Sequence, residues 1–165
     1  MMSNFKADIY KIRKERIFSI SILLCVLLEF LFTFVMREKS GDIGVIMTLS
    51  TSTAFLPLFF IAVDLFVWGE DFVSRTINTQ IIKSKNRLSL FIYKVVTTVL
   101  YSTVHLLVAY LSVAVFRGIF ADSASLSTVW NIAVYQYPYF LCIMFLSIFI
   151  FNYVDKVSYA QLIYV

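Results

Sequence analysis

Residues 69–94, GEDFVSRTINTQIIKSKNRLSLFIYK, form the longest polar segment between two apolar runs, and the rest of the chain is arranged around this segment. It carries five basic side chains against two acidic ones, Glu70 and Asp71. Three apolar residues recur at every fourth position and therefore share one side of a short helix: Val73, Ile77 and Ile81. We expect such a helix to lie along a membrane surface or in the groove of a partner protein. The alternative is a solvated cytoplasmic loop whose lysines and arginines only fix the membrane topology.

The composition places the chain in a lipid bilayer. Of its 165 residues, 61% are apolar and 18% are aromatic, and the mean hydropathy is +0.87. A soluble domain could not bury this much apolar surface. The net charge is +4, but the basic residues cluster next to apolar runs, as membrane-topology signals do. Nucleic acid is therefore not an expected partner, whereas the lipid bilayer is.

Residue types suited to metal, nucleotide or nucleophilic chemistry are scarce. Cys25 and Cys142 each fall inside an apolar run, where a thiol usually behaves as a small hydrophobic side chain, and His105 is the one histidine. The four glycines are scattered, so no phosphate-binding glycine loop is recognisable. We therefore expect no metal, no cofactor and no catalytic residue, and any nucleotide must be bound by another chain.

Four apolar runs are long enough to cross a bilayer as helices, since about 20 residues span the hydrocarbon core. They are residues 17–36, 49–68, 92–116 and 132–154. Pro57 is expected to bend or fray the second span, and Pro138 lies near the start of the fourth. Residues 37–48 and 117–131 form the connections on one side. A further apolar run starts at residue 158 but is too short to cross a bilayer.

The distribution of basic residues predicts the orientation. Eleven of the fourteen lysines and arginines lie in residues 1–16, in residues 69–94 or at position 156. Because positive charge collects on the cytoplasmic side, the N-terminus and residues 69–94 are predicted to be cytoplasmic. Aromatic residues would mark the inner interface (Trp68, Tyr93, Tyr153) and the outer one (Trp130, Tyr135, Tyr137).

Residues 1–16 are basic and have an amphipathic pattern. Three apolar residues share one helical face: Phe5, Ile9 and Ile12. This pattern predicts an interfacial helix that leads into the first span, and a frayed basic tail is the alternative.

Three ionisable residues lie inside the apolar runs, namely Glu29, Asp64 and His105. Such groups are costly in lipid and are therefore functional candidates. Asp64 lies about one turn from the predicted inner interface, where its carboxylate can reach water. Glu29 and His105 both lie about 18–20 Å from the inner ends of their spans at 1.5 Å per residue. We hypothesise a buried contact between Glu29 and His105; alternatively, backbone carbonyls, hydroxyl groups or water satisfy each one.

Small and polar residues recur at steps of four and three along the third span: Thr98, Ser102, His105, Ala109 and Ser112. Small residues let helices approach closely in lipid, so this side is expected to pack on another span rather than line a transport pathway. Both uses could share the stripe.

Acidic, apolar and basic residues follow one another at fixed steps through the central segment: Asp71, Phe72, Thr76, Ile77, Ile81, Ile82, Arg87, Phe91 and Lys94. This order resembles the cytoplasmic loop between the second and third spans of the permease subunits of type 2 ATP-binding cassette transporters. The similarity is greatest to the small permeases of bacitracin-resistance and lantibiotic-immunity exporters. Arg75 stands where that family usually has glycine, and Ser84 where a second glycine is common.

The resemblance implies that a separate cytoplasmic ATPase subunit binds and hydrolyses ATP, and that the loop is a coupling helix in a groove on that subunit. The residues it assigns to coupling are Glu70, Asp71, Phe72, Val73, Arg75, Thr76, Ile77, Ile81, Ile82, Arg87 and Lys94. It also implies a second permease chain, as a homo- or heterodimer. The exported substrate would be a hydrophobic peptide, antibiotic or lipid-like molecule. Family members have six spans, so this chain is expected to be a truncated or split subunit.

The predicted fold is an all-α polytopic membrane protein with four complete transmembrane helices and the start of a fifth. A cytoplasmic or interfacial segment, residues 1–16, precedes a single transmembrane domain, residues 17–165. The expected function is that of a non-enzymatic permease subunit in the plasma membrane. The alternative is a small four-span interaction or immunity protein with no ATPase partner, and co-purification with an ATPase would separate the two.

Overall fold

The computed structural model describes residues 16–39, 41–69, 87–120 and 126–153, and every regular element in this part of the chain is a helix. The elements are α2 (Arg16–Val35), α3 (Gly41–Thr53), α4 (Leu56–Asp64), the π-helical turn η1 (Leu65–Gly69), α7 (Arg87–Phe120) and α8 (Leu126–Tyr153). The predicted interfacial helix, the coupling helix and the fifth apolar run lie outside the described residues.

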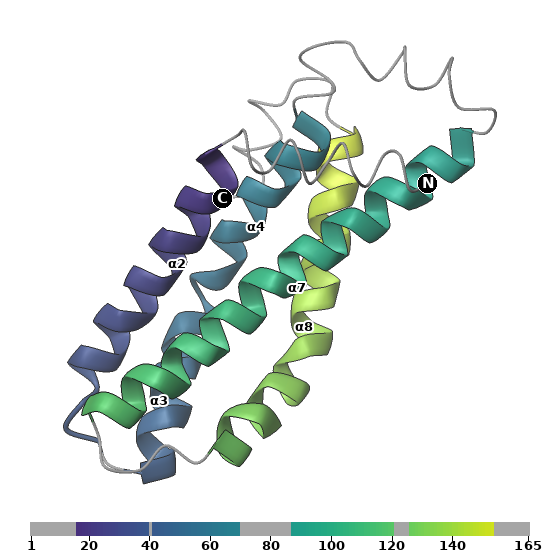
Figure 1. The fold of residues 1–165 in the computed structure, drawn as a ribbon. Coiled ribbons are helices and arrows are strands. Elements are labelled where there is room, and N and C mark those ends of the chain that lie inside the picture. The colour runs from purple at the N-terminus through teal and green to yellow at the C-terminus, as the bar shows by residue number, and fades with distance from the viewer. Residues whose placement is uncertain (1–15, 40, 70–86, 121–125, 154–165) are drawn as a thin grey trace.

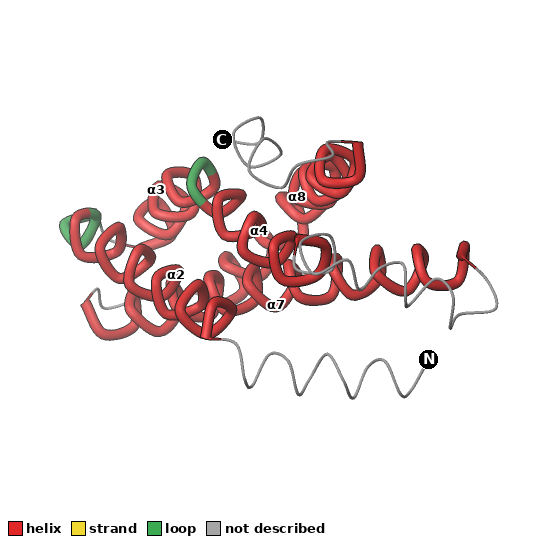
Figure 2. The backbone as a smooth tube through the Cα atoms, turned by 90° about the horizontal axis from the view of Figure 1, so that it is seen from above, coloured by secondary structure: helices red, strands yellow, loops and turns green. Residues whose placement is uncertain are grey.

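The helices run side by side along one long axis, and α7 crosses the others obliquely (Figure 1). The beginning of α2, the end of η1, the beginning of α7 and the end of α8 lie together at one end, which we call the loop end because residues 70–86 connect there. The turn between α2 and α3 lies at the opposite end, the turn end. Seen from above, α4 lies between α2, α7 and α8 and packs against all three (Figure 2).

Three helices are long and apolar enough to cross a membrane, namely α2, α7 from Leu88 onward, and α8. This confirms the expected helical class among the described residues and supports the expectation of a membrane-embedded protein. The second predicted span is not one straight helix. α3 and the continuous pair α4 and η1 form two pieces bent by 44° relative to each other, which together count as a fourth candidate span.

The boundaries expected from hydropathy are too narrow. Residues 37–48 were expected to form a connection, but α3 begins at Gly41, whose φ of 65° ends the turn after α2. Residues 117–131 were also expected to connect two spans, yet α7 continues to Phe120 and α8 begins at Leu126. Pro138 consequently lies well inside α8. Hydropathy reports the lipid-exposed length of a helix, whereas the backbone stays helical beyond it.

The break between α3 and α4 lies next to Pro57, as expected. Proline fits the first turn of α4, where a backbone N–H has no intrahelical acceptor. On the other side of the break, Ser52 and Thr53 both donate side-chain hydrogen bonds to the carbonyl oxygen of Leu49, at 3.2 and 2.6 Å. Hydroxyls that bond back onto a helix in this way favour bending. The bend is therefore encoded on both sides of the break.

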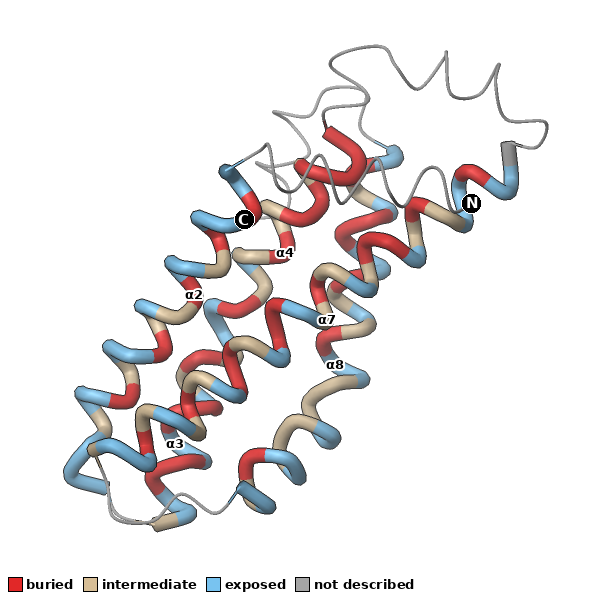
Figure 3. The backbone as a smooth tube through the Cα atoms, in the orientation of Figure 1, coloured by how far each residue is buried: buried red, intermediate tan, exposed pale blue. Residues whose placement is uncertain are grey.

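Burial follows the pattern of a membrane protein rather than a soluble one (Figure 3). Large apolar side chains cover the outside, including Leu23 on α2, Leu111 on α7 and Phe149 on α8. The interior contains ionisable and hydroxyl side chains: Ser21, Glu29, Thr33, Thr48, Ser52, Asp64, Lys94, Thr97, Thr98, Ser102, His105, Arg117 and Ser147. Without a membrane the exposed apolar surface would face water, so this distribution supports a lipid environment.

Candidate functional site

The two ends of the central polar segment are fastened to each other at the loop end. Lys94 Nζ on α7 donates a hydrogen bond to the carbonyl oxygen of Val67 on η1 at 3.0 Å. Trp68 Nε1 donates to Thr98 Oγ1 at 2.9 Å. Lys94 Nζ also lies 5.2 Å from the Trp68 ring centroid, and the Trp68 and Phe91 rings are 5.8 Å apart. We call these five residues, Val67, Trp68, Phe91, Lys94 and Thr98, the loop-base cluster.

The loop-base cluster includes a π-helical turn, Leu65–Gly69. Such turns are rare and occur often at functional sites. Widening the helix changes which backbone carbonyls have partners within it, and here the ammonium group of Lys94 binds the carbonyl of Val67 from the neighbouring helix. The turn η1 is therefore held by α7 as well as by α4.

Most of the expected coupling residues lie outside the described residues: Glu70, Asp71, Phe72, Val73, Arg75, Thr76, Ile77, Ile81 and Ile82. Arg87 is the first residue of α7, and Lys94 belongs to the loop-base cluster. Trp68 was expected to mark the inner interface, but its side chain is buried. The hydrogen bond to Thr98 and the contacts with Lys94 and Phe91 hold the indole between helices.

The interior contains His105 on α7, whose ring is bonded on both sides. Its Nε2 lies 3.1 Å from Ser21 Oγ on α2, and its Nδ1 lies 3.2 Å from the carbonyl oxygen of Tyr101. The hypothesis of a contact with Glu29 is wrong, because Glu29 lies eight residues, or about 12 Å, further along α2 than Ser21. The expected depths of Glu29 and His105 assume spans that begin at residues 17 and 92. In the structure α7 begins at Arg87 and crosses the bundle obliquely, so equal depth along the two helices does not bring these residues together (Figure 1).

Asp64 is fully buried, so the expectation that its carboxylate reaches water is wrong. Its hydrogen-bonding neighbour is Ser147 on α8, whose hydroxyl also donates to the carbonyl oxygen of Met144 at 2.8 Å. The residues next to Asp64 and Ser147 in the chain, Val63 and Ile148, belong to the apolar cluster at the loop end: Phe18, Val63, Phe66, Val67, Trp68, Ile148 and Phe151.

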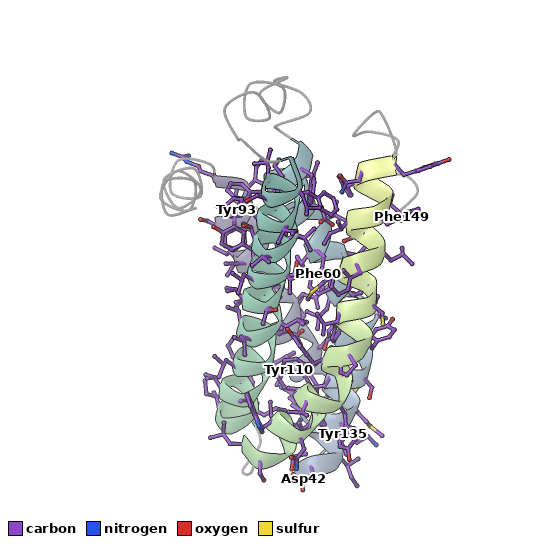
Figure 4. All side chains as sticks on the ribbon, turned by 90° about the vertical axis from the view of Figure 1, so that its right-hand side faces the viewer. Asp42, Phe60, Tyr93, Tyr110, Tyr135 and Phe149 are labelled. Carbon is purple, nitrogen blue, oxygen red and sulfur yellow. The ribbon has the colours of Figure 1, made fainter. Side chains whose placement is uncertain are left out.

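The small and polar stripe on α7 packs against neighbouring helices, as predicted. Thr98, Ser102, His105 and Ala109 are buried, while Ser112 is partly exposed. Thr98 bonds to Trp68 and His105 to Ser21, so the stripe joins α7 to both η1 and α2. Tyr110, next to this stripe, donates to Gln136 Oε1 on α8 at 2.7 Å and lies between the two helices (Figure 4).

Sequence reasoning missed Arg117, which was counted as a charge in an exterior connection. Its side chain is buried at the turn end, and its guanidinium group donates to the carbonyl oxygens of Met36 (3.0 Å), Lys39 and Gly41 (3.4 Å). These carbonyls form the turn between α2 and α3. The step of four residues from His105 through Ala109 and Val113 to Arg117 was the available signal, because it continues the buried stripe.

Comparisons of this chain with protein-family models, with curated proteins and with solved structures find no match.

Proposed function

We propose that the chain is a non-enzymatic permease subunit of an ATP-driven exporter, coupled to a separate cytoplasmic ATPase through residues 69–94. It would lie in the plasma membrane with four spans and a cytoplasmic N-terminus, beside a second permease chain. The substrate class is a hydrophobic peptide, antibiotic or lipid-like molecule. The loop-base cluster is the observation that carries this proposal.

A coupling segment must transmit a push from its partner to the spans. If the ends of the segment were not bonded to the spans, the segment would move without moving the helices. If its ends are bonded to the spans, its movement is transmitted to them. Here two hydrogen bonds, from Lys94 to Val67 and from Trp68 to Thr98, join η1, the last described turn before residue 70, to α7. Movement of residues 70–86 would therefore act on α4 and α7 together, and α4 contacts the other long helices.

The positions of the helix ends also support the proposal. Arg16, the two ends of the central segment and Tyr153 lie at the loop end (Figure 1). With the bent pair counted as one span, the segments holding eleven of the fourteen basic residues would all face the cytoplasm. An ATPase inside the cell would then reach residues 69–94.

The test is a pair of variants on the proposed coupling helix. Ile77→Asp puts a charge into the apolar ridge formed by Val73, Ile77 and Ile81, and we expect loss of the co-purifying ATPase with normal membrane insertion. Thr79→Asp adds the same charge on another side of the helix and should leave the complex intact. The readout is Mg²⁺-dependent ATP hydrolysis that co-elutes with the tagged chain after mild detergent extraction.

Equal ATPase recovery with both variants would contradict the coupling role. A wild-type chain that stays alone under mild extraction would favour the other candidate, a small four-span interaction or immunity protein that acts by binding.

A further inference from the structure

Glu29 and Thr33 place three buried oxygen atoms without partners on one face of α2. Both side chains are fully buried. Neither Glu29 Oε1, Glu29 Oε2 nor Thr33 Oγ1 has a hydrogen-bond partner among the described residues. Residues four apart lie one above the other on a helix, so these atoms face the same part of the interior. Buried polar atoms are nearly always satisfied, so this group requires an explanation.

The neighbouring hydroxyl groups have too few protons to satisfy the carboxyl group. Ser52 on α3 is a hydrogen-bonding neighbour of Glu29, but its one hydroxyl proton is shared with the carbonyl oxygen of Leu49 at 3.2 Å. Tyr110 on α7 also lies near Glu29, and its hydroxyl donates to Gln136 Oε1 at 2.7 Å. Both hydroxyl oxygens are left as acceptors. The surroundings of Glu29 are thus rich in lone pairs and poor in protons to donate.

The buried basic side chains of the described residues form hydrogen bonds with other groups, away from Glu29. Arg117 binds the carbonyls of the α2–α3 turn, and Lys94 binds Val67 at the loop end. His105 lies between Ser21 and the carbonyl of Tyr101. None of them supplies a hydrogen bond to Glu29. An ionised carboxylate in such a place needs a positive charge from another source.

The break between α3 and α4 lies beside this group, since Ser52 is in the last turn of α3. The last carbonyl groups of a helix have no partner within it. In membrane proteins, interrupted helices near buried polar groups provide such carbonyls to dehydrated ions. At this break the carbonyl oxygen of Ser52 accepts from the backbone N–H of Phe55 at 2.9 Å, so the candidate ligands are the side-chain oxygens of Glu29, Thr33 and Ser52.

We propose that Glu29, Thr33 and Ser52 form a binding site for one dehydrated alkali-metal cation, with Na⁺ as the reference ion. All the candidate ligands are oxygen atoms, which hard cations prefer. One carboxylate balances a single positive charge, whereas a divalent ion would remain half neutralised. Asp64 does not contribute, because its side-chain partner is Ser147 on α8 and its neighbour Val63 belongs to the separate apolar cluster at the loop end. The site does not depend on an ATPase partner.

The first test compares thermal unfolding of the full-length chain in mild detergent. The buffers contain NaCl, KCl, LiCl or N-methyl-D-glucamine chloride at constant ionic strength and pH. We expect a saturable rise of Tm with one alkali cation, about 5–10 °C at a concentration about 100-fold above its Kd. Glu29→Gln should abolish the rise, and Thr33→Val should weaken the apparent affinity for the cation about tenfold. Asp64→Asn, the matched acid-to-amide control, should keep it.

The second test measures ²²Na⁺ binding to the wild-type chain, which needs no folded variant. Saturable binding displaced by unlabelled Na⁺ is expected. The proposal is overturned if the wild-type chain binds no ²²Na⁺ and its Tm does not differ among the four chlorides. It is also overturned if Glu29→Gln keeps the cation response. A Tm that changes with pH but not with the metal cation would mean that only a proton occupies Glu29, and it too overturns the metal site.

Discussion

At the scale of single residues, the turn end depends on one arginine and one glycine. Arg117 reaches from α7 to three carbonyl oxygens around the α2–α3 turn. It can do so because Gly44 on α3 has no side chain: a Cβ there would overlap Arg117 Nη2 and the carbonyl oxygen of Lys39. Across the same end, Thr128 Oγ1 on α8 donates to Asp42 Oδ1 at 2.8 Å. The four helices that meet at this end are therefore joined by polar contacts.

Gly44→Ala should destabilise the protein. The added methyl group overlaps backbone as well as the guanidinium group, and overpacking of this kind costs about 1–3 kcal/mol. Gly118→Ala is the control, because a Cβ at Gly118 meets nothing within 4 Å. Alanine is the better helix former, so this control should be neutral or stabilising by about 0.5–1 kcal/mol. Thermal unfolding in detergent measures both, and equal effects would refute the steric role of Gly44.

Arg117→Lys should also destabilise the protein, by about 1–3 kcal/mol, although it keeps the positive charge. Lysine has one nitrogen, and it cannot reach carbonyls on both sides of the turn as the planar guanidinium group does. Arg37→Lys is the matched control, because Arg37 is exposed and should change stability by less than about 0.5 kcal/mol. Equal Tm values for wild type and Arg117→Lys would show that charge alone is sufficient.

At the scale of elements, η1 and α7 are joined by contacts that can be tested as pairs. Trp68 Nε1 and Thr98 Oγ1 form a buried hydrogen bond between two helices. In a double-mutant cycle with Trp68→Phe and Thr98→Val, we expect a coupling energy of about 0.6 kcal/mol, up to about 1.7. The free energies of unfolding in mixed detergent give this value. The control is a second cycle with Trp130→Phe in place of Trp68→Phe. Trp130 is exposed on α8, so the losses of stability from Trp130→Phe and Thr98→Val should be additive.

At the scale of the whole molecule, the arrangement predicts which positions share a side of the membrane. Arg16 and Tyr153 lie at the loop end, and Lys39 and Leu126 lie at the turn end (Figure 1). Single cysteines at these positions, in a background without Cys25 and Cys142, can be labelled with a membrane-impermeant maleimide. We expect positions 39 and 126 to react in intact cells, and positions 16 and 153 only after permeabilisation. Labelling of 16 and 39 from the same side would contradict the spanning of α2.

The helical class, three of the spans and the bend beside Pro57 could be predicted because they depend on nearby residues. Apolar length determines where a helix can cross a bilayer, and proline next to back-bonding hydroxyls determines where it breaks. The buried stripe on α7 was also predictable, since its period follows from helix geometry. Helix ends were predicted less well: residues 41–48 and 126–131 were expected in connections, but they belong to α3 and α8.

The sequence by itself determined that this protein is a bundle of apolar helices with polar residues on their inner faces. Tertiary structure alone decided which of those residues meet. Ser21 rather than Glu29 contacts His105, Asp64 is sealed from water, and Arg117 closes a turn more than 70 residues away in the chain. The physical reason is that the offset between two helices depends on their tilt and on how side chains distant in sequence pack. If one helix slides by two turns along its neighbour, every contact between them changes, but the spacing of polar and apolar residues along each helix stays the same.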